Sequence, residues 1–449
     1  MFAILGAPSA GGTIPVDATP RSTWHHDKKG LTVALAPRPR PADPVRTAQP
    51  DHRRRPRNRR AAVLAAAFDA FAHHGYHDTS MADIARAVHI TPAALYRHFR
   101  NKQHLLGQCV LAGLDEALIR LDAAARSPHA DDAVITALVE IALTRRGLPR
   151  LWQLESRHLG RRDRAAVLLR ATRITGHLRR AIRARRPELS GAQVECLSWC
   201  ALSVAVSPAY HRVELPSPVA ARVLRAALWA VVATDLPEPS GGAARTPHSG
   251  GAEQAGPRRE RILAEATRLF TRHGFPEVSI HDIGAAAGVT GPAVYHYFDS
   301  KAELLDIIVR SHDESIVRLV DGSTGGDRPP EVALDALTRE FVRFGAEDPD
   351  LLAITVSESR HLPGAAERRY RTIRQHAIAR WARTLIAARP ELAPPVARML
   401  VRALTTVVIE AVRNPRLTRR GDLVEFLVAV GLSIQRTPAT RHRVTAPVT

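Results

Sequence analysis

Two short runs of polar residues have the composition of a surface that grips a nucleic acid. Tyr96-Arg97-His98 and Tyr295-His296-Tyr297 each place three polar-tipped side chains directly before a phenylalanine. Phenol and imidazole groups can reach phosphate oxygens, and a guanidinium can bond guanine through two N–H groups or pair with a phosphate. These residues predict recognition of DNA rather than covalent catalysis.

The two runs belong to a long internal repeat. Residues 59–106 align with residues 258–305 at an offset of 199 (274 − 75), and the offset becomes 203 (358 − 155) where Glu-Ser-Arg-His-Leu at 155–159 recurs at 358–362. A period this long indicates two copies of a whole domain, each of about 200 residues. Apolar residues recur at helical spacing and no useful alternating run appears, so we expect an all-α protein.

The elements that would position the polar runs can be placed from their capping residues. A helix from about residue 57 to 74 should end at Gly75, and Ser80 with Asp83 predicts a capping box for a helix over 81–88. Thr91-Pro92 then suits the start of a recognition helix over 92–98, whose N-terminal residues would face base edges. The second copy repeats this order.

The predicted DNA-contacting residues lie on these recognition helices, on the helices that follow, and in the arginine-rich segments that precede each copy. Lys102 could instead be a solvated surface lysine, and the arginine run at 53–60 could be only a solubilising tail. The predicted contacts are Thr91, Ala93, Ala94, Tyr96, Arg97, His98, Lys102, Thr290, Pro292, Tyr295, His296, Tyr297, Lys301, Arg57, Arg59, Arg60, Arg258 and Arg259.

Each repeat resembles the DNA-binding domain of the TetR family of transcriptional regulators. The resemblance rests on Phe71…Gly75-Tyr76, Ile84-Ala85…Val88 and Leu95-Tyr96-Arg97-His98-Phe99…Lys102…Leu105-Leu106, and on the matching residues of the second copy. Copy two departs at Gly284, where alanine is usual, and at Tyr297, where histidine is commoner. The resemblance implies two tandem TetR-like units, each a three-helix helix-turn-helix module followed by a larger helical ligand-binding and dimerisation domain.

The tandem arrangement is similar to double-TetR repressors of actinobacteria. It implies a repressor that releases DNA when a small effector, of lipid or acyl type, binds the larger domain. We expect the two copies to join through helices near 190–207, 218–234, 393–413 and 421–435, as an intrachain pseudo-dimer or, alternatively, within a homodimer of chains. Because TPAALYRHF differs from TGPAVYHYF, the double-stranded operator should be asymmetric.

The repeated Glu-Ser-Arg-His-Leu segment supplies candidate effector contacts, with a buried ion-paired turn as the alternative. A further alternative is that only one copy senses the effector, while the other serves as a scaffold. The candidate ligand-binding residues are Trp152, Glu155, Arg157, His158, Glu358, Arg360 and His361.

Composition narrows the class of partner. The formal net charge is +20, which favours DNA and leaves a sequence-indifferent nucleoid protein as the alternative function. No apolar run is long enough for a membrane span, the first residues do not read as a signal peptide, and three cysteines fit a reducing cytoplasm. Cys196 and Cys200 read as buried thiols rather than a metal or redox pair. We find no phosphate loop, nucleophile elbow or metal motif, so we expect no enzyme activity, no cofactor and no metal.

The expected organisation follows from breaker-rich segments at both ends and in the middle. The expected domains are a disordered segment at 1–55, a helix-turn-helix domain at 56–106, a helical domain at 107–235, a linker at 236–256, a second helix-turn-helix domain at 257–305, a second helical domain at 306–437 and a tail at 438–449.

Overall fold

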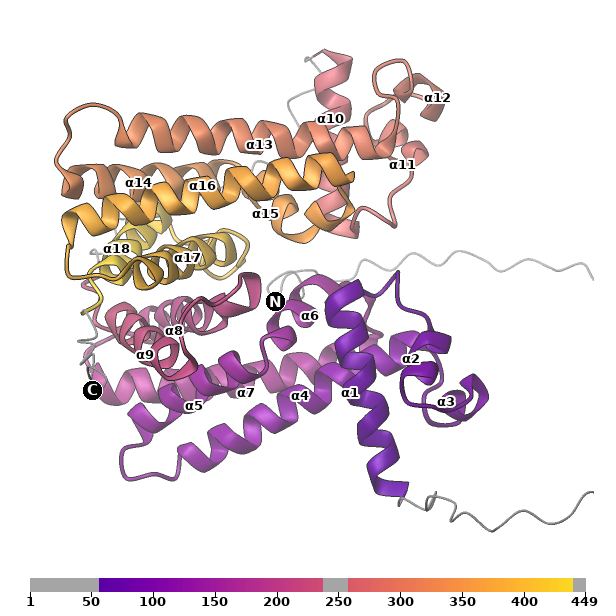
Figure 1. Cartoon of the computed structure of the whole chain (residues 1–449), viewed down its shortest axis with the longest axis horizontal. Coiled ribbons are helices and arrows are strands. Elements are labelled where there is room, and N and C mark those ends of the chain that lie inside the picture. The colour runs from indigo at the N-terminus through magenta and orange to yellow at the C-terminus, as the bar shows by residue number, and fades with distance from the viewer. Residues whose placement is uncertain (1–55, 237–256, 439–449) are drawn as a thin grey trace, which may run out of the picture.

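A computed structural model describes residues 56–236 and 257–438 of the chain, and every element in these ranges is helical (Figure 1). The all-α prediction is confirmed. The disorder expected for 1–55, for the linker and for the tail concerns residues that lie, apart from Leu236 and Pro438, outside the described ranges. Among the described helices, none is both long and apolar enough to cross a membrane.

The first unit runs from α1 to α9. Its helices are α1 (Pro56–His74), α2 (Met81–Ala87), α3 (Pro92–His98), α4 (Lys102–Ala124), α5 (Ala130–Thr144), α6 (Gly147–Glu155), α7 (Arg161–Arg185), α8 (Gly191–Val206) and α9 (Ser217–Val232), with short 3₁₀ turns η2 (Ser156–His158) and η3 (Ser207–Tyr210).

The second unit repeats this order from α10 to α18. Its helices are α10 (Arg258–His273), α11 (Ile280–Ala286), α12 (Gly291–Val294), α13 (Lys301–Thr324), α14 (Pro330–Glu347), α15 (Pro349–Ser357), α16 (Gly364–Ala388), α17 (Pro394–Ala411) and α18 (Leu423–Gln435), with the 3₁₀ turn η4 (Ser359–His361) between α15 and α16.

The predicted capping signals set the short helices of both N-terminal modules. The Ser80 hydroxyl accepts from the backbone N–H of Asp83 at 3.0 Å, and the Asp83 carboxylate accepts in return from the backbone N–H of Ser80. Ser279 and Asp282 repeat this box at the start of α11. Gly75 and Gly274 end the preceding helices with φ of 83° and 88°, a conformation that glycine adopts without strain. These local predictions are confirmed.

The two units share one hydrophobic core at their C-terminal ends. Helices α8 and α9 pack against α17 and α18, and one continuous set of buried apolar residues runs from the first unit into the second. In Figure 1 these four helices lie between the two bodies, on the side away from α3 and α12. Arg398 on α17 also donates to Glu214 across this interface at 2.9 Å. The two units therefore join through the four helices that the sequence analysis predicted for the junction.

The cysteine pair lies within this interface. Cys196 and Cys200 are buried on α8, and burial raises the pKa of both thiols. The thiols are therefore protonated at neutral pH, as the prediction of two buried packing groups requires. The Arg420 guanidinium of the second unit approaches the Cys196 sulfur at 3.7 Å.

Candidate nucleic-acid interface

Helix α3 presents its polar residues outward because two apolar residues anchor its other face. Leu95 and Phe99 are fully buried, whereas Tyr96, Arg97 and His98 are exposed. Thr91 caps the helix by accepting from the backbone N–H of Ala94 at 3.2 Å. Thr91 and Ala93 are exposed and Ala94 is half-buried, so every predicted contact on this helix is accessible.

The corresponding segment of the second unit is wound differently. Helix α12 ends at Val294, and the backbone N–H groups of residues 295–297 donate to carbonyls three residues earlier, as in a 3₁₀ helix. Tyr295 and Tyr297 are 56% and 38% exposed, and His296 and Pro292 are exposed as well. Thr290 caps this segment. The two segments thus differ in shape as well as in sequence.

Gly284 lies close to the turn that leads into α12. A Cβ atom at this position would lie 3.0 Å from backbone atoms of Val289, Thr290 and Gly291. The first unit has Ala85 at the matching place, fully buried. The second module therefore has a glycine where a Cβ would contact the backbone of the turn, and the first module has an alanine at the matching position.

The basic residues that precede each recognition segment lie on the first helix of each module. Arg59, Arg60, Arg258 and Arg259 are exposed. The Arg60 and Arg259 guanidinium groups lie 5.6 Å and 5.1 Å from the rings of Phe99 and Phe298. The side chain of Arg57 and residues 53–55 lie outside what the structure describes. A contact between these arginines and DNA stays a prediction.

Lys102 and Lys301 point into the protein rather than away from it. The Lys102 ammonium donates to the carbonyl of Thr79 at 3.0 Å, and the Lys301 ammonium donates to the carbonyls of Phe275 and Val278 at 2.8 Å and 2.9 Å. Each ammonium also lies over an aromatic ring, at 4.3 Å for Tyr76 and 4.4 Å for Phe275. Burial lowers the pKa of both lysines. These contacts bind the loop after each first helix to the start of the fourth, and a DNA contact by either lysine stays a prediction.

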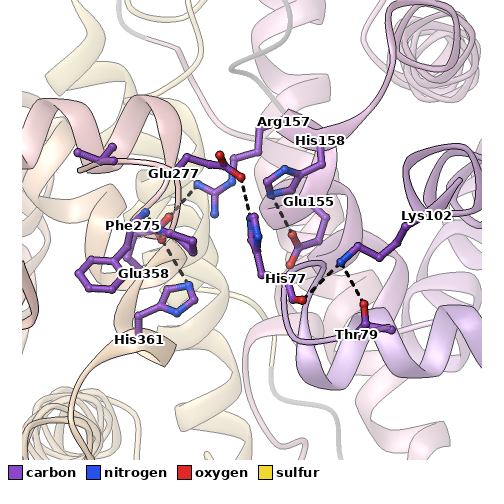
Figure 2. Close-up of polar contacts among 12 residues, drawn as sticks. His77, Thr79, Lys102, Glu155, Arg157, His158, Phe275, Glu277, Glu358 and His361 are labelled. Carbon is purple, nitrogen blue, oxygen red and sulfur yellow. Dashed lines mark hydrogen bonds and ion pairs between the residues drawn. The ribbon is translucent and has the colours of Figure 1, made fainter. Parts of the chain in front are cut away.

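The repeated Glu-Ser-Arg-His segment lies where the two units meet, and its arginines exchange partners across the junction. Arg157 of the first unit donates to Glu358 of the second at 2.9 Å (Figure 2). Arg360 of the second unit donates in turn to Glu155 of the first at 2.7 Å. Both carboxylates are buried. The alternative of a buried ion-paired turn thus describes the observed contacts, with the addition that each pair joins two units.

These ion pairs also contact the helix-turn-helix modules directly. A Cβ on Gly75 would lie 2.5 Å from Nη1 of Arg360, and one on Gly274 would lie 2.3 Å from Nη1 of Arg157. Each arginine therefore packs on the glycine that ends the first helix of the module in the opposite unit. Since that glycine leads directly to α2 or α11, the junction fixes how the two modules stand relative to each other.

The electrostatics of the junction keep its groups in defined charge states. Burial acts to raise the pKa of Glu358, but Arg157 and the backbone N–H of Phe275 outweigh it, and the net pKa is below the usual value. Burial, with Arg157 beside it, lowers the pKa of His158 to about 3. The junction therefore holds an ionised Glu358 carboxylate beside Arg157, together with a neutral His158 imidazole.

The candidate effector contacts separate into two groups. Glu155, Arg157, His158, Glu358, Arg360 and His361 gather at the junction, whereas Trp152 lines an apolar cavity of about 90 Å³ in the first unit. That cavity is also lined by Leu138, Tyr210 and, from the second unit, Glu410. A cavity of about 70 Å³ among α13, α14, α15, α16 and α17 of the second unit contains His312, Asp313 and Tyr370. Sequence reasoning missed these cavities because their apolar residues have the same helical spacing as any core.

Comparison with known proteins bears on the two modules. The family described as "Bacterial regulatory proteins, tetR family" matches residues 63–109 and 262–308. The chain is 30% identical over 82 residues to the HTH-type transcriptional regulator UidR of Escherichia coli K12, covering 18% of this chain and 42% of UidR. It is 28% identical over 105 residues to the HTH-type transcriptional repressor KstR2 of Rhodococcus jostii RHA1, covering 23% of this chain and 52% of KstR2. The matched part thus spans about half the length of these relatives.

Among solved structures, one unit superposes on a TetR-family transcriptional regulator from Bordetella parapertussis 12822, with 22% identity and a TM-score of 0.36 over 39% of this chain and 93% of that one. Both family matches coincide with the modules whose polar residues α3 and α12 expose. The chain therefore carries two tandem helix-turn-helix modules of the kind found in bacterial regulatory proteins of the tetR family, at residues 63–109 and 262–308.

Proposed function

We propose that the chain is a repressor that reads an operator of two unlike half-sites as an intrachain pseudo-dimer. The observation that carries this proposal is that one chain holds two different recognition segments, on two units that buried ion pairs join. In Figure 1 both segments lie on the same side of the molecule. Helix-turn-helix dimers place their recognition helices about 34–36 Å apart, one turn of DNA. Here one chain supplies both helices.

The exposed residues predict how the half-sites differ. Arg97 offers a bidentate donor to guanine, whereas the matching His296 offers a single ring and Tyr297 replaces His98. The 3₁₀ winding of residues 295–297 also presents these side chains at a different angle from α3. We therefore expect one half-site to require a guanine that the other does not.

Footprinting followed by titration of labelled operators tests this proposal. The parent chain should prefer an asymmetric operator, by about a thousandfold or more over bulk DNA. The double variant His296→Arg with Tyr297→His should move the preference toward two copies of the first half-site. The control variant Arg97→His with His98→Tyr should move it toward two copies of the second. A palindromic operator for the parent chain contradicts the proposal, and equal binding to all DNA favours the nucleoid-type alternative, which the net charge of +20 keeps open.

The oligomeric state has its own measurement. One chain per operator in sedimentation is the expected result, because the four-helix interface is already formed within the chain. A complex with two chains and four modules would support the homodimer alternative. One of the actinobacterial tandem repressors that the chain resembles controls a mammalian-cell-entry operon. Genome-wide footprinting would also test whether the operator of this chain belongs to such an operon, and whether the protein resides on the nucleoid.

We further propose that the effector binds the cavity of the first unit. Its apolar lining suits a lipid or acyl-type molecule, and the lining also includes Tyr210 and Glu410. Because Glu410 comes from α17 of the second unit, binding there would act on the contact between the units. A series of fatty acids should release the operator from the parent chain and not from Leu138→Trp, which fills the cavity; Leu319→Trp in the second cavity is the matched control. Release from Leu138→Trp at parental concentrations would contradict this location.

A further inference from the structure

Three potential metal ligands converge where the two DNA-binding modules meet the first body. They are His77 from the loop after α1, His158 from η2 and Glu277 from the loop after α10 (Figure 2). One ligand atom from each residue can be chosen so that all three atoms lie within 4.8 Å of one another. The residues come from two units and three separate elements, so the tertiary fold alone brings them together.

The two imidazoles have ring nitrogens without hydrogen-bond partners. Nε2 of His77 and Nε2 of His158 are both buried and unbonded. The nearest carboxylate oxygen to His77 is Oε1 of Glu277 at 3.1 Å, in a geometry that makes no hydrogen bond. His158 is nine-tenths buried, and its nearest carboxylate oxygen, on Glu155, is 3.6 Å away. A buried polar atom with no partner is costly, and a bound ion would supply both nitrogens with one.

We propose that His77, His158 and Glu277 form a site for a divalent transition metal ion, with Zn²⁺ the best match. Two imidazoles and one carboxylate are a ligand set that Zn²⁺ takes, with water in the fourth position. Ligand atoms about 2.0–2.2 Å from a tetrahedral ion stand roughly 3.3 Å apart. The pair at 3.1 Å already meets this spacing, and the remaining ligand atom has to close by about 1.5 Å at most.

Three cationic side chains, those of Arg157, Arg360 and Lys102, lie near His158, and a metal ion would have to bind beside them. Arg157 and Arg360 are paired with Glu358 and Glu155, so neither needs the carboxylate of Glu277. Among the described residues, the ion-pair contact of Glu277 is with His77. Glu277 is 53% exposed, which gives the ion a path from solvent.

The equivalent position in the other half of the junction lacks one of the three ligands. The residues that match His158 and Glu277 are His361 and Asp78, but the residue that matches His77 is Pro276. The site is therefore confined to one side of the junction. Asp78→Asn removes the matching carboxylate from the half without the site, which makes it a control for Glu277→Gln.

Metal binding would also act on the DNA-binding geometry. The ligands belong to both helix-turn-helix modules and to the first body, so an ion would hold the modules at one spacing. Coupling between two sites is reciprocal, so an operator that fits this spacing should raise the metal affinity by the same factor as the metal raises the operator affinity. This coupling rests on the proposed function, whereas the metal site does not.

Zn²⁺ binding to the full-length chain without DNA tests the site, by competition with a chromogenic chelator and by metal analysis after dialysis. We expect one ion per chain, and a tetrahedral absorption spectrum when Co²⁺ replaces Zn²⁺. His77→Gln and Glu277→Gln should each weaken binding at least tenfold, whereas Asp78→Asn and the exposed-residue control His74→Gln should bind like the parent chain. Thermal melts verify that each variant is folded.

Two results would overturn the proposal: fewer than one ion per chain in the parent, or equal affinity in Glu277→Gln and Asp78→Asn. Neither result touches the asymmetric-operator proposal, because the measurement contains no DNA. Conversely, a palindromic operator would leave the metal titration unchanged.

Discussion

The two junction carboxylates should respond unequally to the same substitution. Glu358 accepts from Arg157 at 2.9 Å with one oxygen and from the backbone N–H of Phe275 at 3.0 Å with the other. Glu155 accepts from Arg360 with Oε1, while its Oε2 has no hydrogen-bond partner. In Glu155→Gln, the new amide NH₂ can therefore replace an oxygen that accepts no hydrogen bond.

In Glu358→Gln, by contrast, the amide NH₂ must replace an oxygen that accepts a hydrogen bond, because both oxygens of Glu358 do so. Whichever way its amide turns, the NH₂ group faces either the guanidinium or the Phe275 N–H, and one buried donor loses its acceptor. An unsatisfied buried donor costs about 1–3 kcal/mol beyond the loss of the charge that both variants share. We expect Glu358→Gln to lower the free energy of unfolding by about 1–3 kcal/mol more than Glu155→Gln does.

Equilibrium urea unfolding of the full-length chain, followed by circular dichroism and by tryptophan fluorescence, measures this difference. The two probes must give coincident transitions before the free energies are compared. Adding Arg157→Met to Glu358→Gln removes the unpaired guanidinium, and should recover part of the loss because breaking one side of a buried pair costs more than replacing both. Equal losses in the two single variants, or a larger loss in Glu155→Gln, would refute the geometric reasoning.

Three further outcomes follow from the structure. Lys102→Met and Lys301→Met should lower the melting temperature, because each ammonium binds backbone carbonyls, and an unchanged melting temperature would contradict this structural role; the DNA contact predicted for either lysine would in addition reduce the slope of log affinity against log salt by about one unit. Gly284→Ala should weaken binding to the second half-site specifically, since its Cβ would press on the turn before α12, and equal binding by variant and parent would contradict this. Burial raises the pKa of Glu410 in the folded state, so its ionisation penalises folding increasingly as pH rises above the ordinary value of 4.5; Glu410→Gln should therefore gain melting temperature over the parent at pH 7 but not at pH 4, and a pH-independent difference would argue against a raised pKa.

The local structure of the DNA-binding modules could be predicted from the sequence because it depends on neighbours in the chain. Ser80 with Asp83, Thr91 with Pro92, and Gly75 each act within three or four residues, and the structure has these features where the sequence placed them. The repeat also located the four helices that join the units, because long apolar helices near the end of each copy need a surface to bury.

The junction could not be predicted in the same way. The repeated Glu-Ser-Arg-His segment was evident, but its exchange of partners joins residues more than 200 positions apart, and helical periodicity carries no information on such pairs. The orientation of Lys102 was equally hidden, because a lysine at the start of a helix has the same sequence context whether it faces DNA or a carbonyl group. Side-chain direction in these cases is a property of the assembled modules.

Duplication within one chain explains why the junction can be asymmetric. In a homodimer the same patch meets itself across a twofold axis, so a residue placed on one side appears on both. Here the equivalent positions of the two copies hold different residues: His77 corresponds to Pro276, and Asp78 corresponds to Glu277. Of the two junction carboxylates, Glu358 accepts a backbone N–H and Glu155 does not. The arginines that bridge the units are retained in both copies, because removing either would leave a buried carboxylate unpaired. The ion-paired frame that holds the recognition segments is therefore the same in both copies, whereas the residues around it and the exposed surfaces of α3 and α12 differ between the copies.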